Sequence, residues 1–152
     1  MAHLFDPLPL RQLTLTNRIG VPPMCQYSAV DGVAQDWHFV HYGSRAVGGA
    51  GLVILEATGV LPEGRISPAD LGLWDDGQIE PLARITRFLR SHGCVSALQL
   101  AHAGRKGSLA LGWQKQRALT PAEGGWKTVA PSALAFDPDY DLPEALDAEG
   151  VR

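Results

Sequence analysis

Two hydrophobic periods alternate along the chain and predict strands and helices in turn. Residues 8–19 interleave leucines with polar side chains, which indicates a hairpin-like segment, and a short apolar strand follows over residues 19–24. Residues 51–58 form a nearly continuous apolar run, which is typical of a parallel strand buried on both faces, and a third strand is predicted over residues 95–101. The two prolines in the first of these strands weaken its hydrogen-bond ladder, because proline has no N–H to donate.

A first helix is predicted from Asp36, a good N-cap residue, to the glycines at positions 48 and 49. Its apolar stripe consists of Phe39, Tyr42 and Ala46, and a more polar edge is lined by His38, His41 and Arg45. The glycine-rich residues 48–51 precede a strand, whereas a dinucleotide-binding loop follows a strand and opens a helix. We therefore interpret them as a helix–strand connection.

A second helix is predicted from Asp75–Asp76 to about Ser91. Its inner side is marked by Ile79, Leu82, Ala83, Thr86 and Leu89. Arginines at positions 84, 87 and 90 repeat every three residues and could bind anions, but we interpret this stripe as a solvated face.

The order hairpin, β, α, β, α, β predicts a parallel sheet built of βα units. Residues 104–146 have no sustained periodicity and read as one long loop. Residues 146–152 predict the start of another helix, with Asp147 as its cap. Because three parallel strands cannot close a barrel, we interpret residues 1–152 as the N-terminal part of a single larger α/β domain whose remainder lies outside this chain.

Composition narrows the class of protein. Of the 152 residues, 45% are hydrophobic and 19% are charged, with a net charge of −3, which indicates a globular protein and gives no basic footprint for nucleic acid. No apolar run approaches the roughly 20 residues of a membrane span, and the first residues lack a secretory signal pattern. We expect a cytoplasmic protein without a nucleic-acid or membrane partner.

The cysteines point to chemistry rather than to a structural bridge. Two cysteines are too few for a disulfide scaffold. Cys25 follows the first parallel strand and Cys94 precedes the third, so they lie at opposite ends of the sheet and should not bridge. Because ligands bind at the carboxyl ends of parallel strands, Cys25 is a candidate nucleophile or redox thiol, the alternative being a small buried hydrophobe.

Two further clusters, residues 56–58 and 99–105, lie at the same strand ends as residues 22–27. Tyr27 could donate a hydrogen bond or a proton to a substrate. The alternative is that its ring only packs against neighbouring side chains. Glu56 lies inside an apolar run and must be paired or protonated; we favour a structural ion pair, with Arg105 as a candidate partner. The Gln99 amide suits a heterocycle with adjacent C=O and N–H groups.

Two other motifs could form a metal site or a phosphate site. His38 and His41 could ligate a metal, but no carboxylate or cysteine completes the set at sensible spacing, so no metal site is predicted. Gly104 to Ser108 (Gly-Arg-Lys-Gly-Ser) follows a strand and could cradle a phosphate, although it lacks the P-loop pattern and no clear helix follows. A phosphate-binding α/β enzyme is therefore one alternative function.

Read in order, several segments resemble the old yellow enzyme family of FMN-dependent ene-reductases, in the branch of bacterial xenobiotic reductases. The segments that carry the resemblance are residues 15–19 (Leu-Thr-Asn-Arg-Ile), 22–27, 37–42, 56–58, 64–66, 71–74, 99–106 and 130–133. The resemblance implies an α/β fold of the TIM (β/α)8 type with an N-terminal hairpin closing its bottom. This chain would supply the hairpin, the first three βα units and a long third loop.

The resemblance also implies the cofactors and the site. FMN would be bound, with NAD(P)H as hydride donor. Cofactor contacts would come from Pro22, Pro23, Met24, Cys25, Ala57 and Gln99. Within this set, residues 22–25 run along the flavin ring, Ala57 packs close to it and Gln99 bonds its pyrimidine edge. Cys25 would tune the flavin, and Tyr27 would contact the substrate; these two are the predicted catalytic residues.

The implied reaction transfers hydride from reduced flavin to the β-carbon of an alkene activated by a carbonyl or nitro group, and a proton is added at the α-carbon. The family's pair of nitrogen ligands, its proton-donating tyrosine and its phosphate loops belong to later βα units. We therefore expect the C-terminal remainder of the barrel as a partner, homo-oligomers of the full protein, and no activity from this chain alone. The second alternative is an inactive truncated product that acts only through a partner chain.

Overall fold

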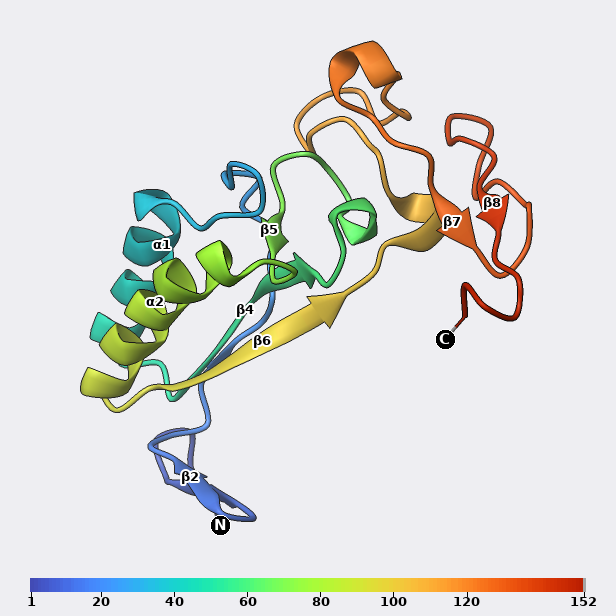
Figure 1. Cartoon of the computed structure of the whole chain (residues 1–152). Coiled ribbons are helices and arrows are strands. Elements are labelled where there is room, and N and C mark those ends of the chain that lie inside the picture. Colours follow the sequence, from blue (N-terminus) through green and yellow to red (C-terminus); the bar gives the residue numbers. More distant parts are fainter. Residues whose placement is uncertain (152) are drawn as a thin grey trace.

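The computed structural model describes residues 1–151. An antiparallel hairpin of β1 (Leu8–Leu10) and β2 (Leu13–Leu15) stands apart from a parallel sheet, at the end of the molecule that carries the N-terminus (Figure 1). The sheet contains β3 (Gly20–Val21), β4 (Leu52–Gly59) and β6 (Val95–Ala101), with β4 between the other two. The predicted hairpin and parallel βα order are confirmed.

The first parallel strand is shorter than residues 19–24, because Pro22 and Pro23 follow β3 and cannot donate to a ladder. A strand that the sequence did not predict, β5 (Leu71–Gly72), pairs in parallel with β4 at Thr58 and Gly59. β5 lies on the same edge of β4 as β3, but farther along the strand. Residues 22–33 therefore leave the sheet between β3 and β5.

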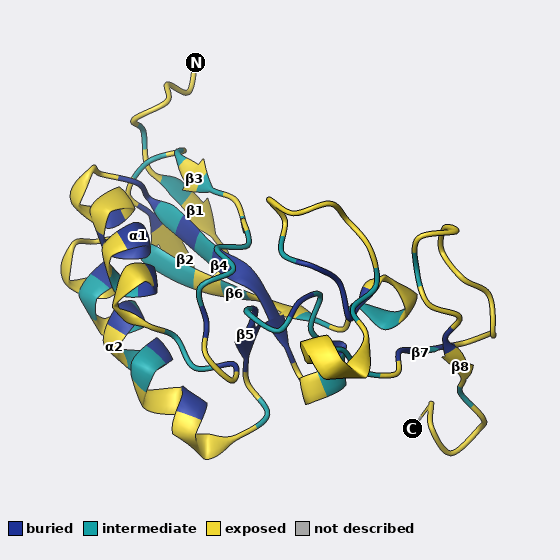
Figure 2. Ribbon diagram, turned by 90° about the horizontal axis from the view of Figure 1, so that it is seen from above, coloured by how far each residue is buried: buried dark blue, intermediate teal, exposed yellow. Residues whose placement is uncertain are grey.

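Two helices cover one face of the sheet, and their buried sides face β4 and β6 (Figure 2). They are α1 (Asp36–Val47) and α2 (Ile79–Ser91), the second preceded by a 3-10 turn, η2 (Asp76–Gln78). The core between helices and sheet consists of Ala29, Tyr42, Ala46, Ala50, Val53, Leu55, Leu71, Leu82, Ile85, Leu89 and Cys94. This packing fixes the carboxyl ends of the strands relative to one another.

Two details of α1 differ from the prediction. The N-cap position is Gln35, and Asp36 is the first helical residue. His38 and His41 do not line a polar edge, since their exposed fractions are 0% and 6%. His38 can be buried because the Gln35 N–H donates to its Nδ1 at 3.0 Å, which satisfies one ring nitrogen.

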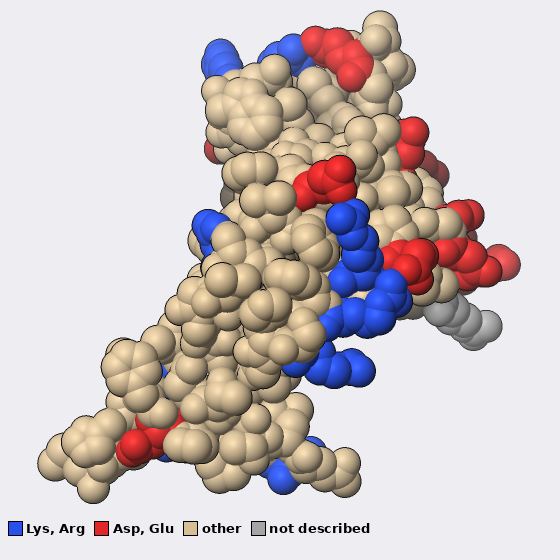
Figure 3. Space-filling view, turned by 90° about the vertical axis from the view of Figure 1, so that its left-hand side faces the viewer, with Lys and Arg blue, Asp and Glu red and all other residues tan. Residues whose placement is uncertain are grey.

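In the first turns of α2, the buried face of the helix differs from the predicted one. Ile79 is 51% exposed, whereas Ile85, which was not predicted to face inward, is 2% exposed. The solvated arginine stripe is confirmed: Arg84 pairs with Asp36 and Arg87 with Glu80 on the surface. Figure 3, which faces the helix side of the molecule, shows basic side chains with acidic ones beside them.

The long third loop, residues 104–146, contains several short helical turns and strands. These are η3 (Gly104–Lys106), η4 (Pro121–Glu123), and the parallel pair β7 (Val129–Ala130) and β8 (Glu144–Ala145). It lies beyond the carboxyl end of β6 (Figure 1).

Trp126 pins this loop to the body of the protein. Its Nε1 donates to the Glu63 carbonyl at 2.9 Å, and its main-chain N–H donates to the Ser108 hydroxyl at 2.8 Å. The Arg65 guanidinium lies 5.1 Å from the Trp126 ring and 5.2 Å from the Trp74 ring, so it stacks near both. The return of the loop is therefore fixed against residues 62–74.

The predicted helix over residues 146–152 is not formed in its described part. Residues 148–151 form a turn in which the Asp147 carboxylate accepts from the main-chain N–H groups of Glu149 and Gly150, so Asp147 does act as a cap. Arg152 lies outside the described residues. Within residues 1–151, neither α1, α2 nor any shorter helix has the length and apolar content needed to cross a bilayer.

The difference between Ile79 and Ile85 is testable with one matched pair. Ile85→Ala removes buried methyl groups and is expected to lower the free energy of unfolding by about 2–5 kcal/mol. Ile79→Ala, on the exposed side of the same helix, should change it by less than about 0.5 kcal/mol. Urea denaturation of the purified protein measures both, and a comparable loss at Ile79 would contradict this orientation of α2.

Candidate functional site

Three of the predicted cofactor residues meet at the carboxyl ends of neighbouring strands. Ala57 on β4 and Gln99 on β6 are direct partners in the parallel register. Cys25 follows β3, which pairs with β4 on the edge opposite β6, and the Ala57 main chain lies near its thiol. Residues far apart in the sequence are thus brought side by side, as the strand order predicts.

The surface over these residues is open and suits a flat heterocycle. The Gln99 side chain is exposed, and so is Met24, at 44%, whereas Ala57 presents only a methyl group, at 9% exposure. Pro22 and Pro23 carry no N–H, so this stretch of main chain has few donors. An exposed amide with both a donor and an acceptor beside a small residue is compatible with the edge of a heterocycle such as FMN.

The Cys25 thiol is held in its neutral form. Desolvation by burial raises its pKa to about 11, and the nearby carboxylates of Asp70 and Glu56 add to the increase. Cys25 and Cys94 are both free thiols, in agreement with the expectation that they do not bridge. At neutral pH Cys25 can therefore donate a weak hydrogen bond but is a poor nucleophile.

Tyr27 adopts an unusual backbone conformation next to the thiol. Its φ of +50° lies in the left-handed region, which is uncommon outside glycine. The edge of its ring meets Trp113, with centroids 5.7 Å apart, and an added Cβ at Gly112 would come within 2.7 Å of the Tyr27 ring. Burial raises the pKa of the phenol, and the charges of nearby groups raise it further. Tyr27 thus enters the site as a neutral hydroxyl.

The expectation that Arg105 pairs with Glu56 is wrong. Arg105 is exposed and donates to the Leu134 carbonyl. Glu56 is fully buried and accepts from the Gln26 main-chain N–H at 3.0 Å and from the Tyr42 hydroxyl. Its carboxyl group therefore receives hydrogen bonds from α1 and from the segment after β3, and the ion pair is replaced by neutral donors.

The sequence did not indicate Tyr42 and Asp70 as residues of the site, and it placed Gln26 in the cluster of residues 22–27 without a role. Tyr42 was placed in an apolar stripe, yet its hydroxyl bonds Glu56. The Gln26 side chain accepts from Trp37 Nε1 at 3.1 Å and donates to the Met24 carbonyl at 2.8 Å. Asp70 is 1% exposed and accepts from the main-chain N–H groups of residues 66 and 67 and from a serine hydroxyl. A polar atom at the tip of a mostly apolar side chain was the available signal for Tyr42.

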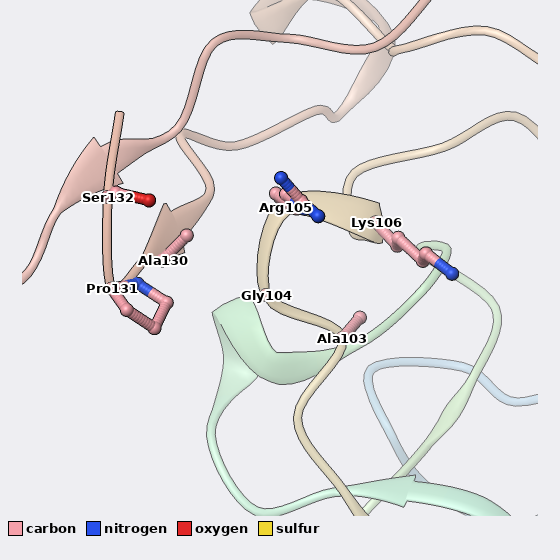
Figure 4. Close-up of a pocket in the computed structure, with 7 residues that line it drawn as sticks. All are labelled: Ala103, Gly104, Arg105, Lys106, Ala130, Pro131 and Ser132. Carbon is pink, nitrogen blue, oxygen red and sulfur yellow. The ribbon is translucent and has the colours of Figure 1, made fainter. Parts of the chain in front are cut away.

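The phosphate-loop alternative loses its donors in the structure. The Gly104 N–H donates to His102 Nδ1, and those of Lys106 and Gly107 donate to carbonyls within the loop. The Ser108 hydroxyl oxygen accepts from the Trp126 N–H, and the residue is fully buried, so it is not presented to a ligand. A groove of about 360 Å³ does separate residues 103–106 from residues 130–132, but the Lys106 side chain points away from the latter (Figure 4). A cradle of free N–H groups is therefore not formed here.

No metal centre emerges either. Among residues 1–151, no three histidine, cysteine, aspartate or glutamate side chains are grouped so that they could hold a metal ion. His38 instead serves the start of α1, and its Nε2 faces Glu56 Oε2 at 3.8 Å.

The position of the site defines the class: an α/β protein whose candidate cofactor face lies at the carboxyl ends of parallel strands. The model of the NADH:flavin oxidoreductase / NADH oxidase family matches residues 3–136, and the chain belongs to this family, which is that of the old yellow enzymes. FMN and a nicotinamide hydride donor are the cofactors of this family. The fold is that of the hairpin and first βα units of a TIM barrel.

Individual relatives agree with this assignment. The chain is 48% identical over 154 residues to an NADPH dehydrogenase of Listeria monocytogenes, covering 100% of this chain and 41% of that protein. It is 46% identical to an NADH:flavin oxidoreductase of Gibberella zeae, covering 98% of this chain and 37% of that protein. The chain thus spans about two fifths of the length of these curated relatives.

Solved structures give the same result. Morphinone reductase superposes with a TM-score of 0.80 at 30% identity, covering 97% of this chain and 40% of that one. An old yellow enzyme homologue from Zymomonas mobilis superposes with a TM-score of 0.79 at 31% identity, covering 99% and 41%.

The neutral state of Cys25 predicts its pH response. With a pKa of about 11, its thiolate appears only as the pH rises towards that value. At pH 7 the thiolate fraction is about 100-fold below that of an ordinary cysteine, and since a more basic thiolate is a better nucleophile, alkylation should be about tenfold slower than for a free thiol. Iodoacetamide labelling read by peptide mapping measures this, and a rate that levels off below pH 9 would contradict the assigned environment.

Proposed function

We propose that this chain forms one wall of the FMN site in an NAD(P)H-dependent ene-reductase. The observation that carries the proposal is that Ala57 and Gln99 pair in register on β4 and β6, with the Cys25 thiol from the segment after β3 near the Ala57 main chain. The set has one amide with both a donor and an acceptor, a small residue and a redox-capable thiol, which matches the edge, face and reactive region of a flavin.

In this role each residue orients the cofactor rather than reacting with it. The Gln99 amide would bond the pyrimidine edge, and residues 22–25 would lie along the ring, with Pro22, Pro23 and Met24 contacting it through the main chain. Cys25, kept neutral by its surroundings, would adjust the redox poise of the ring by donating a weak hydrogen bond. FMN, when bound, supplies the hydride transfer.

The proposed substrate is an alkene activated by a carbonyl or nitro group. Hydride arrives at the β-carbon and a proton at the α-carbon, so the products balance as a saturated carbonyl or nitro compound. Tyr27 stands beside the site as a neutral phenol and would contact the substrate. Trp113 meets its ring edge-on and would extend the apolar wall on that side.

The rest of the proposal concerns what surrounds this wall. The other βα units of the barrel would supply the phosphate clamp and the groups that grip the substrate, and we expect the full protein to form homo-oligomers. Two free thiols favour a reducing compartment, so we place the protein in the cytoplasm. The competing proposal is an inactive product that acts only through a partner chain.

A native mass spectrum of the purified protein separates these two proposals. A species that carries FMN, whether in one chain or in a complex, supports the reductase. The bare mass of this chain with no ligand supports the inactive product. If FMN is present, anaerobic mixing with NADPH or NADH should bleach the flavin absorbance, and 2-cyclohexenone should restore it; a flavin that no nicotinamide bleaches would overturn the proposal.

Removing the Gln99 amide tests the site itself. Gln99→Ala deletes one neutral hydrogen-bonding group and is expected to weaken FMN binding about tenfold, which corresponds to about 1–1.5 kcal/mol. Flavin fluorescence quenching measures the dissociation constant. Gln116→Ala, on the exposed third loop, is the matched control and should leave FMN binding unchanged; equal affinities for both variants would place the flavin elsewhere.

A further inference from the structure

The β4 strand has an irregularity at the site, and Glu56 is its extra residue. Leu55 pairs with Leu98 and Ala57 pairs with Gln99, so Glu56 has no partner on β6. A β-bulge of this kind frees one main-chain N–H from the ladder and re-aims a side chain, and bulges are over-represented next to active sites. Here the side chain turns into the protein interior, where Glu56 is 0% exposed.

Tyr42 satisfies the bulge at two points. Its hydroxyl oxygen accepts the freed main-chain N–H of Glu56 at 3.0 Å, and its proton is donated to Glu56 Oε2. Tyr42 is itself 1% exposed and comes from α1, so the bulge is tied to the helix layer. One hydroxyl thus fixes both the backbone and the side chain of Glu56.

Burial raises the pKa of the Glu56 carboxyl, and the hydrogen bonds from the Gln26 N–H and the Tyr42 hydroxyl act against that rise. Both of its oxygens accept, Oε1 from the Gln26 N–H and Oε2 from the Tyr42 hydroxyl. The Nδ1 of His38 accepts from Gln35, so the proton of this neutral ring is on Nε2, which faces Glu56 Oε2 at 3.8 Å. Nothing that touches the carboxylate requires a proton from it.

The third hydrogen bond of Glu56 connects it to the segment that carries Cys25 and Tyr27. The N–H that Oε1 accepts belongs to Gln26, the residue between Cys25 and Tyr27. Tyr27 has a positive φ, a conformation that persists only where the surroundings hold it. The segment has left the sheet after β3, so its place depends on contacts of this kind rather than on a strand ladder.

We propose that Glu56 is a positioning residue, which, held by Tyr42 at the bulge of β4, fixes the Gln26 main chain and so places Cys25 and Tyr27 against the flavin and the substrate. The proposal rests on the proposed function for what Cys25 and Tyr27 face. The anchoring itself concerns this chain alone and can be measured without FMN.

The test compares two substitutions of Glu56. Glu56→Leu removes both acceptor oxygens, whereas Glu56→Gln keeps one oxygen as an acceptor for the Gln26 N–H and replaces Oε2, the acceptor of the Tyr42 hydroxyl, with an NH2 group. Hydrogen exchange should show the Gln26 amide exchanging at least tenfold faster in Glu56→Leu and within about threefold of the unmodified protein in Glu56→Gln. Alkylation of Cys25 should follow the same order, with about a tenfold increase in Glu56→Leu as the thiol gains solvent.

A control separates positioning from general loss of stability. Thr58→Val removes a buried hydroxyl from the same strand, and the hydrogen bond of that hydroxyl goes to the Glu56 carbonyl rather than to its carboxyl group or to the Gln26 N–H. It should lower the melting temperature while leaving both Gln26 exchange and Cys25 alkylation unchanged. If Glu56→Leu does not fold, Tyr42→Phe replaces it, because loss of the hydroxyl frees the bulge while keeping the ring.

The outcomes are distinct. Equal exchange and alkylation in the Leu and Gln variants, or values at the unmodified level in both, would overturn the proposal. If no FMN binds even in the presence of the rest of the barrel, but the expected order of exchange is seen, the proposed function is contradicted while the anchoring role stands. With FMN bound, a shift of the flavin absorbance maximum in Glu56→Leu that Glu56→Gln reverses would link the anchor to the cofactor.

Discussion

Burying a carboxyl group is costly unless hydrogen-bond donors surround it, and the fold supplies such donors to Glu56 from two directions. Tyr42 reaches it from α1 and the Gln26 main chain reaches it from the segment after β3, while the His38 Nε2 lies 3.8 Å from Oε2. Because these donors come from separate elements, the helix layer, the central strand and the wall of the site hold one another in place. A change in any one would leave a buried carboxyl oxygen without its donor.

The burial of this carboxyl group also sets the chemistry of its neighbours. The carboxylates of Glu56 and Asp70 both disfavour the thiolate of Cys25, although desolvation is the larger cause of its high pKa. The same surroundings keep the Tyr27 phenol neutral. The site therefore presents polar groups that donate hydrogen bonds without carrying charge, which suits a reaction whose electrons come from a cofactor rather than from a protein nucleophile.

The sequence predicted the fold wherever one period dominated. The apolar run at 51–58 and the run at 95–101 became β4 and β6, and the strand-end rule brought Cys25, Ala57 and Gln99 together. It could not predict β5, whose two residues have no periodicity. The burial of Ile85 was readable from its helical spacing to Leu82 and Leu89, but the predicted inner side began one residue set away, at Ile79.

The partner of Glu56 could not be predicted for a different reason. A bulge shifts the register by one residue and so changes where the Glu56 side chain points, and no local sequence pattern at 55–57 indicates a bulge. Arg105 seemed suited by charge, but η3 directs it to the Leu134 carbonyl at the surface. Tyr42 was hidden because a buried tyrosine reads as apolar until a partner for its hydroxyl is known.

The way the third loop is fastened has a consequence for protein engineering. Its near end is paired at Leu109 and Ala118, and its return is fixed by Trp126 against Glu63 and Ser108. The span between these fastenings carries Trp113, yet it contributes nothing to the sheet or to the buried carboxylate. Grafting loops of other lengths and sequences between the fixed ends would therefore vary the surface beside Tyr27 while leaving the strands β4 and β6 unchanged. This span is thus a natural place for a combinatorial library aimed at substrate range.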